Sequence, residues 1–283
     1  MSVRYLLLLT IVLTLLGGCS ALGPTHDVKG PVPLNKAVAE VPENQLLDVW
    51  IELFDPGELP EDEDEAMGLS MDIRDAEARY IPEQLRTTME STGHWGAVRV
   101  VPQETTGAEL LVQGSIIASD GEQLALQIKA LDASGREWFD RAYEQELIEG
   151  VYKARGLIRN PPSQDVFQSL YNTIANDLAE FRRTLTTTDV ETIRQVAELR
   201  FAADLSPEAF ADDLQLDANG RYTVVHLPAA DDPMYQRVLA IRDRDFLLID
   251  TLNGHFDNFC REMDTPYNEW RKARSEEAAA LRK

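Results

Sequence analysis

The chain has 283 residues and a formal net charge of −22, from 49 acidic and 27 basic side chains. This excess of acid argues against nucleic-acid binding, which depends on basic patches. It also disfavours a broad electrostatic attraction to anionic lipid headgroups. Hydrophobic residues make up 44% of the chain, which is enough for one or two domains to bury cores without disulfides.

The first eighteen residues predict a secretory leader. Arg4 is the only charge before an apolar run over residues 6–16, and this run is shorter than the roughly 20 residues that a transmembrane helix needs. A positive start, a short apolar core and small residues before a cleavage point are the layout of a signal peptide. Residues 1–18 are therefore expected to be removed.

The leader ends in Leu16-Gly17-Gly18-Cys19, which resembles the lipobox of bacterial lipoproteins. In that family the leader is cut before the cysteine, and the new terminal cysteine carries acyl chains. The resemblance implies that Cys19 is a lipidation site, with about 0.8 kcal/mol of membrane affinity for each buried CH₂. Ser20 follows, and by the family's sorting rules this implies the periplasmic face of the outer membrane. The alternative is an ordinary signal peptide with an incidental cysteine.

Residues 19–44 are predicted to form a flexible tether, because four prolines stand there among small and polar residues. Such a tether would let the folded part of the protein stand away from the membrane.

An α+β domain is predicted over residues 45–150. Alternating apolar residues at 47–53 indicate a strand, and a helix is expected to begin at Pro82, after a possible turn at 73–80, and to end at Gly93. Turn sequences separate the later runs, which favours an antiparallel meander backed by a helix. The later predicted strands are residues 97–101, 109–118, 123–131 and 136–147.

Residues 160–283 are predicted to form a helical C-terminal domain. Apolar residues recur every three or four positions from Phe167 to Phe181, and Thr188 with Glu191 fits a capping box. Asp232-Pro233 begins a long helix that runs toward Met263, and Thr265-Pro266 begins a final one. The predicted fold class is α+β: a small antiparallel sheet with a packed helix, followed by a mainly helical C-terminal region.

The sequence carries no motif for catalysis or for a cofactor. The four histidines lack metal-ligand spacing, and no phosphate-binding loop, serine elbow or dinucleotide fingerprint is present. The acidic residues within 58–65 lack the order of a calcium loop, so a solvated loop is expected, with cation or basic-partner binding as the alternative. No cofactor and no metal are therefore predicted, and the protein is not expected to be an enzyme.

A charged cluster on the long helix is the candidate partner-binding face: Arg237, Arg242, Arg244 and Asp245. The main alternative is a face of ion pairs, either solvated or between domains. A catalytic site would instead require Arg242, Asp245, Asp250 or His255 to converge in a cleft.

Residues 46–147 have an order that resembles the small α+β domain of the TolB amino-terminal domain, CsgG and LpoB. The resemblance lies in Ser91-Thr92-Gly93 leading to the strand at 97–101, in Leu110-Leu111-Val112-Gln113-Gly114, and in the Asp132-Ala133-Ser134-Gly135 turn. It implies a non-catalytic module that docks envelope partners. The chain departs from that pattern in its acidic insertion at 58–65 and in lacking long pore-forming hairpins.

The expected function is therefore that of a non-catalytic lipoprotein, anchored to the outer membrane and acting as an accessory of a cell-envelope complex, with an unidentified protein as partner. The alternative is a lipoprotein that binds a lipid or small ligand in transport, between the sheet and the helices. A periplasmic enzyme comes third.

Replacing Cys19 with Ala should move the protein from the membrane fraction to the soluble fraction while leaving its fold unchanged, because the acyl chains would be the anchor. Fractionation followed by circular dichroism measures both effects. A Cys19→Ala protein that stays in the membrane fraction would contradict the lipidation prediction.

Overall fold

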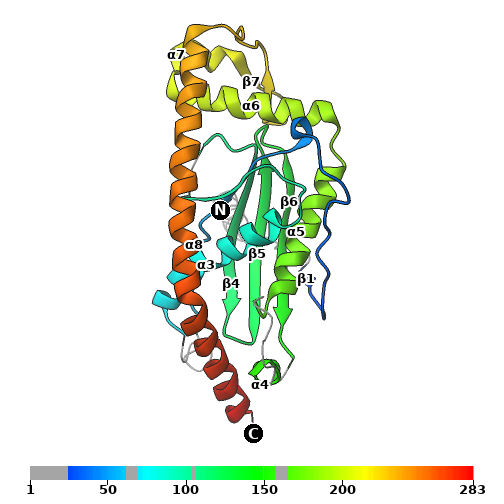
Figure 1. Cartoon of the computed structure of the whole chain (residues 1–283), viewed down its shortest axis with the longest axis vertical. Helices are drawn as coiled ribbons and strands as arrows, with labels where there is room; N and C mark the ends of the chain where they lie inside the picture. The colour runs from blue at the N-terminus through cyan, green and yellow to red at the C-terminus, as the bar shows by residue number, and fades with distance from the viewer. Residues whose placement is uncertain (1–24, 62–68, 104–105, 149, 157–164, 283) are drawn as a thin grey trace, which may run out of the picture.

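The computed structural model describes residues 25–61, 69–103, 106–148, 150–156 and 165–282. The predicted leader and Cys19 lie outside these ranges, as do residues 62–65 of the acidic stretch at 58–65. The element labels are those of Figure 1.

A mixed six-stranded sheet in the order β1-β6-β5-β4-β2-β3 forms the centre of the molecule (Figure 1). Strands β4, β5 and β6 are antiparallel, whereas β2 is parallel to both β3 and β4, and β1 is parallel to β6. The bounds are β1 His26–Asp27, β2 Val49–Glu52, β3 Val98–Val101, β4 Leu110–Ser119, β5 Gln123–Asp132 and β6 Glu137–Glu146. A small second sheet pairs β7 Leu214–Leu216 with β8 Tyr222–Val224.

Two helices, α3 and α5, cover one face of the sheet, α6 crosses one end, and α8 runs along the side of the molecule (Figure 1). The helices and turns are α3 Met71–Glu90, α4 Val151–Gly156, α5 Gln168–Arg183, α6 Thr187–Leu205, α7 Pro207–Phe210 and α8 Pro233–Leu281, with short 3₁₀ turns at Glu43–Gln45 and Ala211–Asp213.

One core extends over both of the predicted domains. The alternating apolar residues of the strands pack against α3, α5 and α6, and the same cluster contains Val49, Ile128, Leu178 and Val196. The predicted boundary near residue 160 therefore does not separate two cores. The reason is that the apolar stripe of α5 is buried against the strands of the predicted α+β domain.

The α+β class is confirmed, with a helical C-terminal region. The sheet is mixed and not fully antiparallel, because the connection from β2 through α3 returns the chain parallel to β2 as β3.

Helix α3 begins eleven residues before the predicted start and contains Pro82 in its interior. Ser70 caps it, its hydroxyl accepting from the Ile73 N–H at 3.3 Å. Proline has no N–H to donate to the carbonyl four residues earlier. That carbonyl, on Ala78, accepts instead from the Phe54 N–H at 3.0 Å, two residues beyond the end of β2. The proline in this helix therefore leaves an acceptor that joins the helix to the sheet.

The predicted flexible tether differs from the structure over its described part. His26 and Asp27 pair with β6 as strand β1. Further along, the Asn172 side chain donates to the Val32 carbonyl at 2.7 Å, and Asn176 donates to the Pro33 carbonyl at 3.0 Å. The amide side chains of α5 satisfy a proline-containing backbone that has few donors of its own, so this segment lies against the body.

Two helix ends also differ from the prediction. The capping box of α6 is formed by Thr186 and Asp189, two residues before the predicted pair. Helix α8 does not end near Met263 but continues through Pro266 as a single helix of 49 residues, about 73 Å long at 1.5 Å per residue. Its N-cap is as predicted, with the Asp232 carboxylate accepting from the Met234 N–H at 2.7 Å.

Helix α8 is joined to the edge strand β3 by one buried amide side chain. Asn253 accepts from the Val100 N–H at 2.7 Å and donates to the Val100 carbonyl at 3.1 Å. These are the two bonds that a neighbouring strand would make to this residue. The side chain therefore substitutes for a seventh strand at that point and fixes the height of α8 on the sheet.

Gly114 and Gly254 should respond to alanine in opposite directions. A Cβ at Gly114 would lie 2.5 Å from the buried ring of Phe54, so Gly114→Ala should cost about 1–3 kcal/mol through overpacking. A Cβ at Gly254, within α8, would meet nothing within 4 Å, so Gly254→Ala should stabilise by about 1 kcal/mol. Urea unfolding of the three proteins measures both. Equal stability of the Gly114→Ala and unmodified proteins would refute the tight contact.

Candidate partner-binding surface

The surface at α8 carries apolar side chains that the core does not use. Leu247 and Leu248 are 67% and 59% exposed, and Leu252 is 40% exposed. Ile241, Leu248 and Leu252 are separated by seven and four residues, so they lie on one face of the helix. Leu247 points about 100° away from Leu248, because successive residues of an α-helix are rotated by that angle.

The four predicted partner-face residues divide into two groups. Arg237, Arg244 and Asp245 are exposed on α8. Arg242 is buried, and its guanidinium lies 3.4 Å from the Glu198 carboxylate of α6 and 4.0 Å from that of Glu109. It therefore holds α8 against α6 and the sheet and is not part of the free face, because it lies on the helix side that carries Val238.

Under this face, α8 contacts the sheet through the Phe246 ring and the guanidinium groups of Arg99 and Arg242. We call this contact the joint. Phe246 lies 4.6 Å from the Arg99 guanidinium and 4.9 Å from that of Arg242. Arg99 also donates to Asp250 at 2.7 Å and to Asp48 at 2.9 Å. Cation–π contacts and ion pairs thus reinforce one another where the helix meets β2 and β3, so the joint is held rigidly.

An apolar groove of about 390 Å³ opens beside this joint, between the end of α6 and α8. Its floor is Trp50, which is 3% exposed and packs edge-on against Phe246 with ring centres 6.1 Å apart. Leu205, at the end of α6, and Leu248 stand at its rim and are exposed. The full lining is Trp50, Thr106, Phe201, Asp204, Leu205, Asp245, Phe246, Leu248 and Ile249.

Sequence patterns pointed to Asp245 but missed the other components of the groove. Trp50 is a buried core residue that also forms the groove floor, and Phe201 and Leu205 belong to α6. The available signal was the spacing of Ile241, Leu248 and Leu252, which places apolar residues outside the stripe that packs on the body. That α6 would lie beside them could not be read from the sequence, because the contact depends on tertiary packing.

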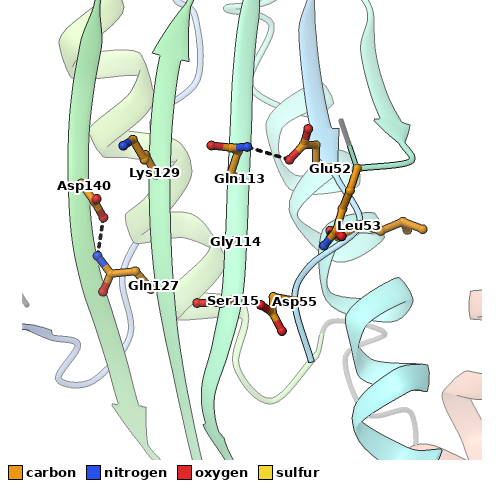
Figure 2. A pocket seen from close by; sticks show the side chains of 10 residues that line it. Glu52, Leu53, Asp55, Gln113, Gly114, Ser115, Gln127, Lys129 and Asp140 are labelled. Carbon is orange, nitrogen blue, oxygen red and sulfur yellow. Dashed lines mark hydrogen bonds between the residues drawn. The ribbon is translucent and has the colours of Figure 1, made fainter. Parts of the chain in front are cut away.

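The uncovered face of the sheet forms a second, polar depression of about 390 Å³ (Figure 2). Amide and carboxylate groups pair across neighbouring strands there: Gln113 donates to Glu52 at 2.8 Å and Gln127 to Asp140 at 2.5 Å. Its described lining contains no histidine or cysteine, so Ser115 has no imidazole beside it to act as a base. The arrangement is that of a solvated sheet face.

A buried ionic cluster joins the other end of α8 to α3 and to the start of α5. Arg271 is 0% exposed and donates to Asp165 at 2.7 Å, and its guanidinium lies 3.9 Å from the Tyr267 ring. The Tyr267 hydroxyl donates to Glu77 at 2.5 Å, and burial raises the pKa of that carboxyl. These groups are closed off from solvent, so they offer no reactive surface.

The residues proposed for a catalytic alternative do not converge. Arg242 pairs with Glu198, Asp250 pairs with Arg99, and His255 is exposed on α8. Among the described residues no group of three or more His, Cys, Asp or Glu side chains could hold a metal ion. Cys260 is buried against α3, and burial raises the pKa of its thiol to about 12, so it stays a protonated thiol at neutral pH.

Comparisons with family profiles, with curated proteins and with solved structures find no match to this chain. The lipobox and the TolB, CsgG and LpoB resemblance therefore remain predictions. None of the helices in the described ranges combines the length and the apolar content that crossing a bilayer requires.

Glu109 lies beside Arg242 of the joint. Its ionisation should lower the free energy of unfolding as the pH rises from 4.5 to 6. Burial raises its pKa from 4.5 to about 6, although Arg194 at 3.6 Å and Arg242 at 4.0 Å oppose the shift. The folded state therefore holds this proton more tightly than the unfolded chain does, and ionisation above pH 6 weakens folding by about 2 kcal/mol.

Glu109→Gln removes that ionisation while its amide oxygen can still accept from the Asp48 N–H, a bond of 2.8 Å in the native protein. The stability of the variant relative to the native protein should rise by about 2 kcal/mol between pH 4.5 and pH 7. Urea unfolding at several pH values measures the difference, and a difference that does not change with pH would show that Glu109 has an ordinary pKa.

Proposed function

We propose that this protein is a non-catalytic lipoprotein of the cell envelope, anchored through Cys19 to the periplasmic face of the outer membrane, which binds a protein partner at the α8 side of its sheet. The observation that carries the proposal is the row of exposed leucines on α8. Large apolar side chains grouped at the surface mark interaction sites, and here they stand beside an apolar groove.

The contacts that attach α8 to the body support the proposal that the helix holds its exposed leucines in place for a partner. Arg242 with Glu198, Asn253, and Arg271 with Asp165 hold the helix at three heights by other faces. Leu247, Leu248 and Leu252 are not needed for that attachment, since all three remain exposed. A rigid helix face loses little conformational freedom when it binds, which favours affinity.

The path of the chain supports placing the anchor and the partner on different sides. His26 is already part of β1, seven residues after Cys19, so the free length between the lipid and the body reaches at most about 25 Å. Strands β1 and β3 are the two edges of the sheet, about 24 Å apart at the usual strand spacing. Helix α8 packs along β3, and so its exposed face lies beyond the edge opposite the anchor.

The alternative of lipid or small-ligand capture between sheet and helices has less support. The space between the sheet and α3 and α5 is filled by large side chains, among them Phe54, Tyr143 and Tyr171, all 2% exposed or less. The groove at α8 is shallow at its rim, where Leu205 and Leu248 are exposed, whereas sites for free apolar ligands bury most of the ligand.

Photo-crosslinking in intact cells of the source organism tests the proposal. A photoreactive amino acid at Leu247, Leu248 or Leu252 should yield an adduct with another envelope protein. The control position is Val38, an equally apolar and fully exposed residue on the anchor side, which should yield none. The absence of an adduct from all three α8 positions, with the protein in the membrane fraction, would overturn the proposed role of α8.

A further inference from the structure

The rim of the α8 groove is negatively charged. Asp204 and Asp245 line it, both are exposed, and its described lining holds no lysine, arginine or histidine. Asp204 also belongs to the last turn of α6, which contains no basic residue. Helix carbonyls and the negative end of the macrodipole gather there, so an acidic side chain at this point adds to a potential that is already negative.

The apolar surface continues past the groove along α8. Leu248 stands at the rim, Leu252 lies one turn further on the same face, and Ile241 lies two turns before Leu248. The result is an apolar strip along one face of α8, which the end of α6 borders at the groove. This is the shape that receives another amphipathic helix, whose apolar positions recur at intervals of three, four and seven residues.

From this shape and charge, and on the basis of the proposed function, we infer that the groove between α6 and α8 binds an amphipathic helix of a protein partner that carries lysine or arginine beside its apolar stripe. The apolar stripe of that helix covers Trp50 and Leu248. Its cations lie against Asp204, Asp245 and the carboxyl end of α6.

A second copy of this chain fits the groove less well. Each copy has a net charge of −22, so two copies repel one another at long range. The strip itself offers the same acidic rim on both copies, and an isologous contact would set Asp204 and Asp245 near their equivalents. A basic helix instead gains attraction from the same groups and approaches faster because of it.

Two synthetic peptides and purified Cys19→Ala protein of the full mature chain test the inference. Both peptides are eighteen-residue amphipathic helices with a leucine stripe; one has lysines beside the stripe and the other glutamates. Fluorescence anisotropy of the labelled peptides measures binding. The lysine peptide should bind the native surface at least about tenfold more tightly than the glutamate peptide, since like charges oppose the latter.

Variants locate the site. Leu248→Asp should weaken binding of the lysine peptide at least about tenfold, because it places a charge in the apolar contact. Leu216→Asp is the matched control: it makes the same substitution at an exposed leucine of β7 that does not line the groove, and it should alter affinity less than about twofold. The double variant Asp204→Lys, Asp245→Lys should lose the lysine peptide and gain the glutamate peptide.

Three results would overturn the inference: equal weakening by Leu216→Asp and Leu248→Asp, equal binding of the two peptides to the native surface, or no binding of either. Sedimentation of the same proteins supplies a further arm, since a dimer that Leu248→Asp abolishes would assign the groove to a second copy. If crosslinks in cells arise at Leu247 but the peptides ignore Leu248, the proposed function stands and only the groove assignment fails.

Discussion

A buried ion pair between Arg271 and Asp165 is the constraint on which the arrangement of this protein depends. The two residues are 106 positions apart and their side chains are 0% and 1% exposed. A charge in such surroundings is tolerated only with a partner, and removing one member strands the other, at a cost of about 3–5 kcal/mol. The pair therefore requires α8 to lie against the start of α5 and against α3, where Tyr80 also donates to Asp165 at 3.2 Å.

The rest of α8 follows from that fixed end. The helix rises past β3, where Asn253 bonds to the strand backbone, and reaches α6, where Arg242 and Tyr235 both contact Glu198. A helix that is fixed at its lower end, middle and upper end has one orientation about its own axis. That orientation decides which side chains are left outside, and Leu248 and Asp245 are among them.

Local patterns in the sequence were sufficient for the strands and for most helices, since alternation and three-to-four spacing are properties of neighbouring residues. They were insufficient wherever a distant group changed the local rule. Pro82 predicts a helix start, but in the structure α3 continues through it, and the Phe54 N–H donates to the Ala78 carbonyl that the proline leaves free. The segment at 25–36 has the composition of a tether and is fixed by Asn172 and Asn176, side chains about 140 residues away.

The candidate surface likewise contains residues that the sequence could predict and residues that only the structure shows. Arg237, Arg244 and Asp245 could be placed on an exposed helix face from their spacing, whereas Arg242 could not be distinguished from them without the position of Glu198. The groove floor at Trp50 comes from a strand nearly 200 residues before Leu248 in the chain. No periodicity connects the two, so the site could be found only from the packed structure.

Asn253 also affects how this protein behaves at high concentration. An exposed edge strand offers unpaired N–H and C=O groups to the edges of other molecules, which is a common route to aggregation. At β3 those groups at Val100 are already bonded to the Asn253 side chain and covered by a helix. At the opposite edge, the described part of β1 pairs with β6 at Tyr143 and Glu144, and the rest of β6 carries Glu137, Asp140 and Arg141. One edge is thus closed by an amide and the other is protected by charge, which lets a sheet with an uncovered face remain separate from its neighbours when many copies are crowded together.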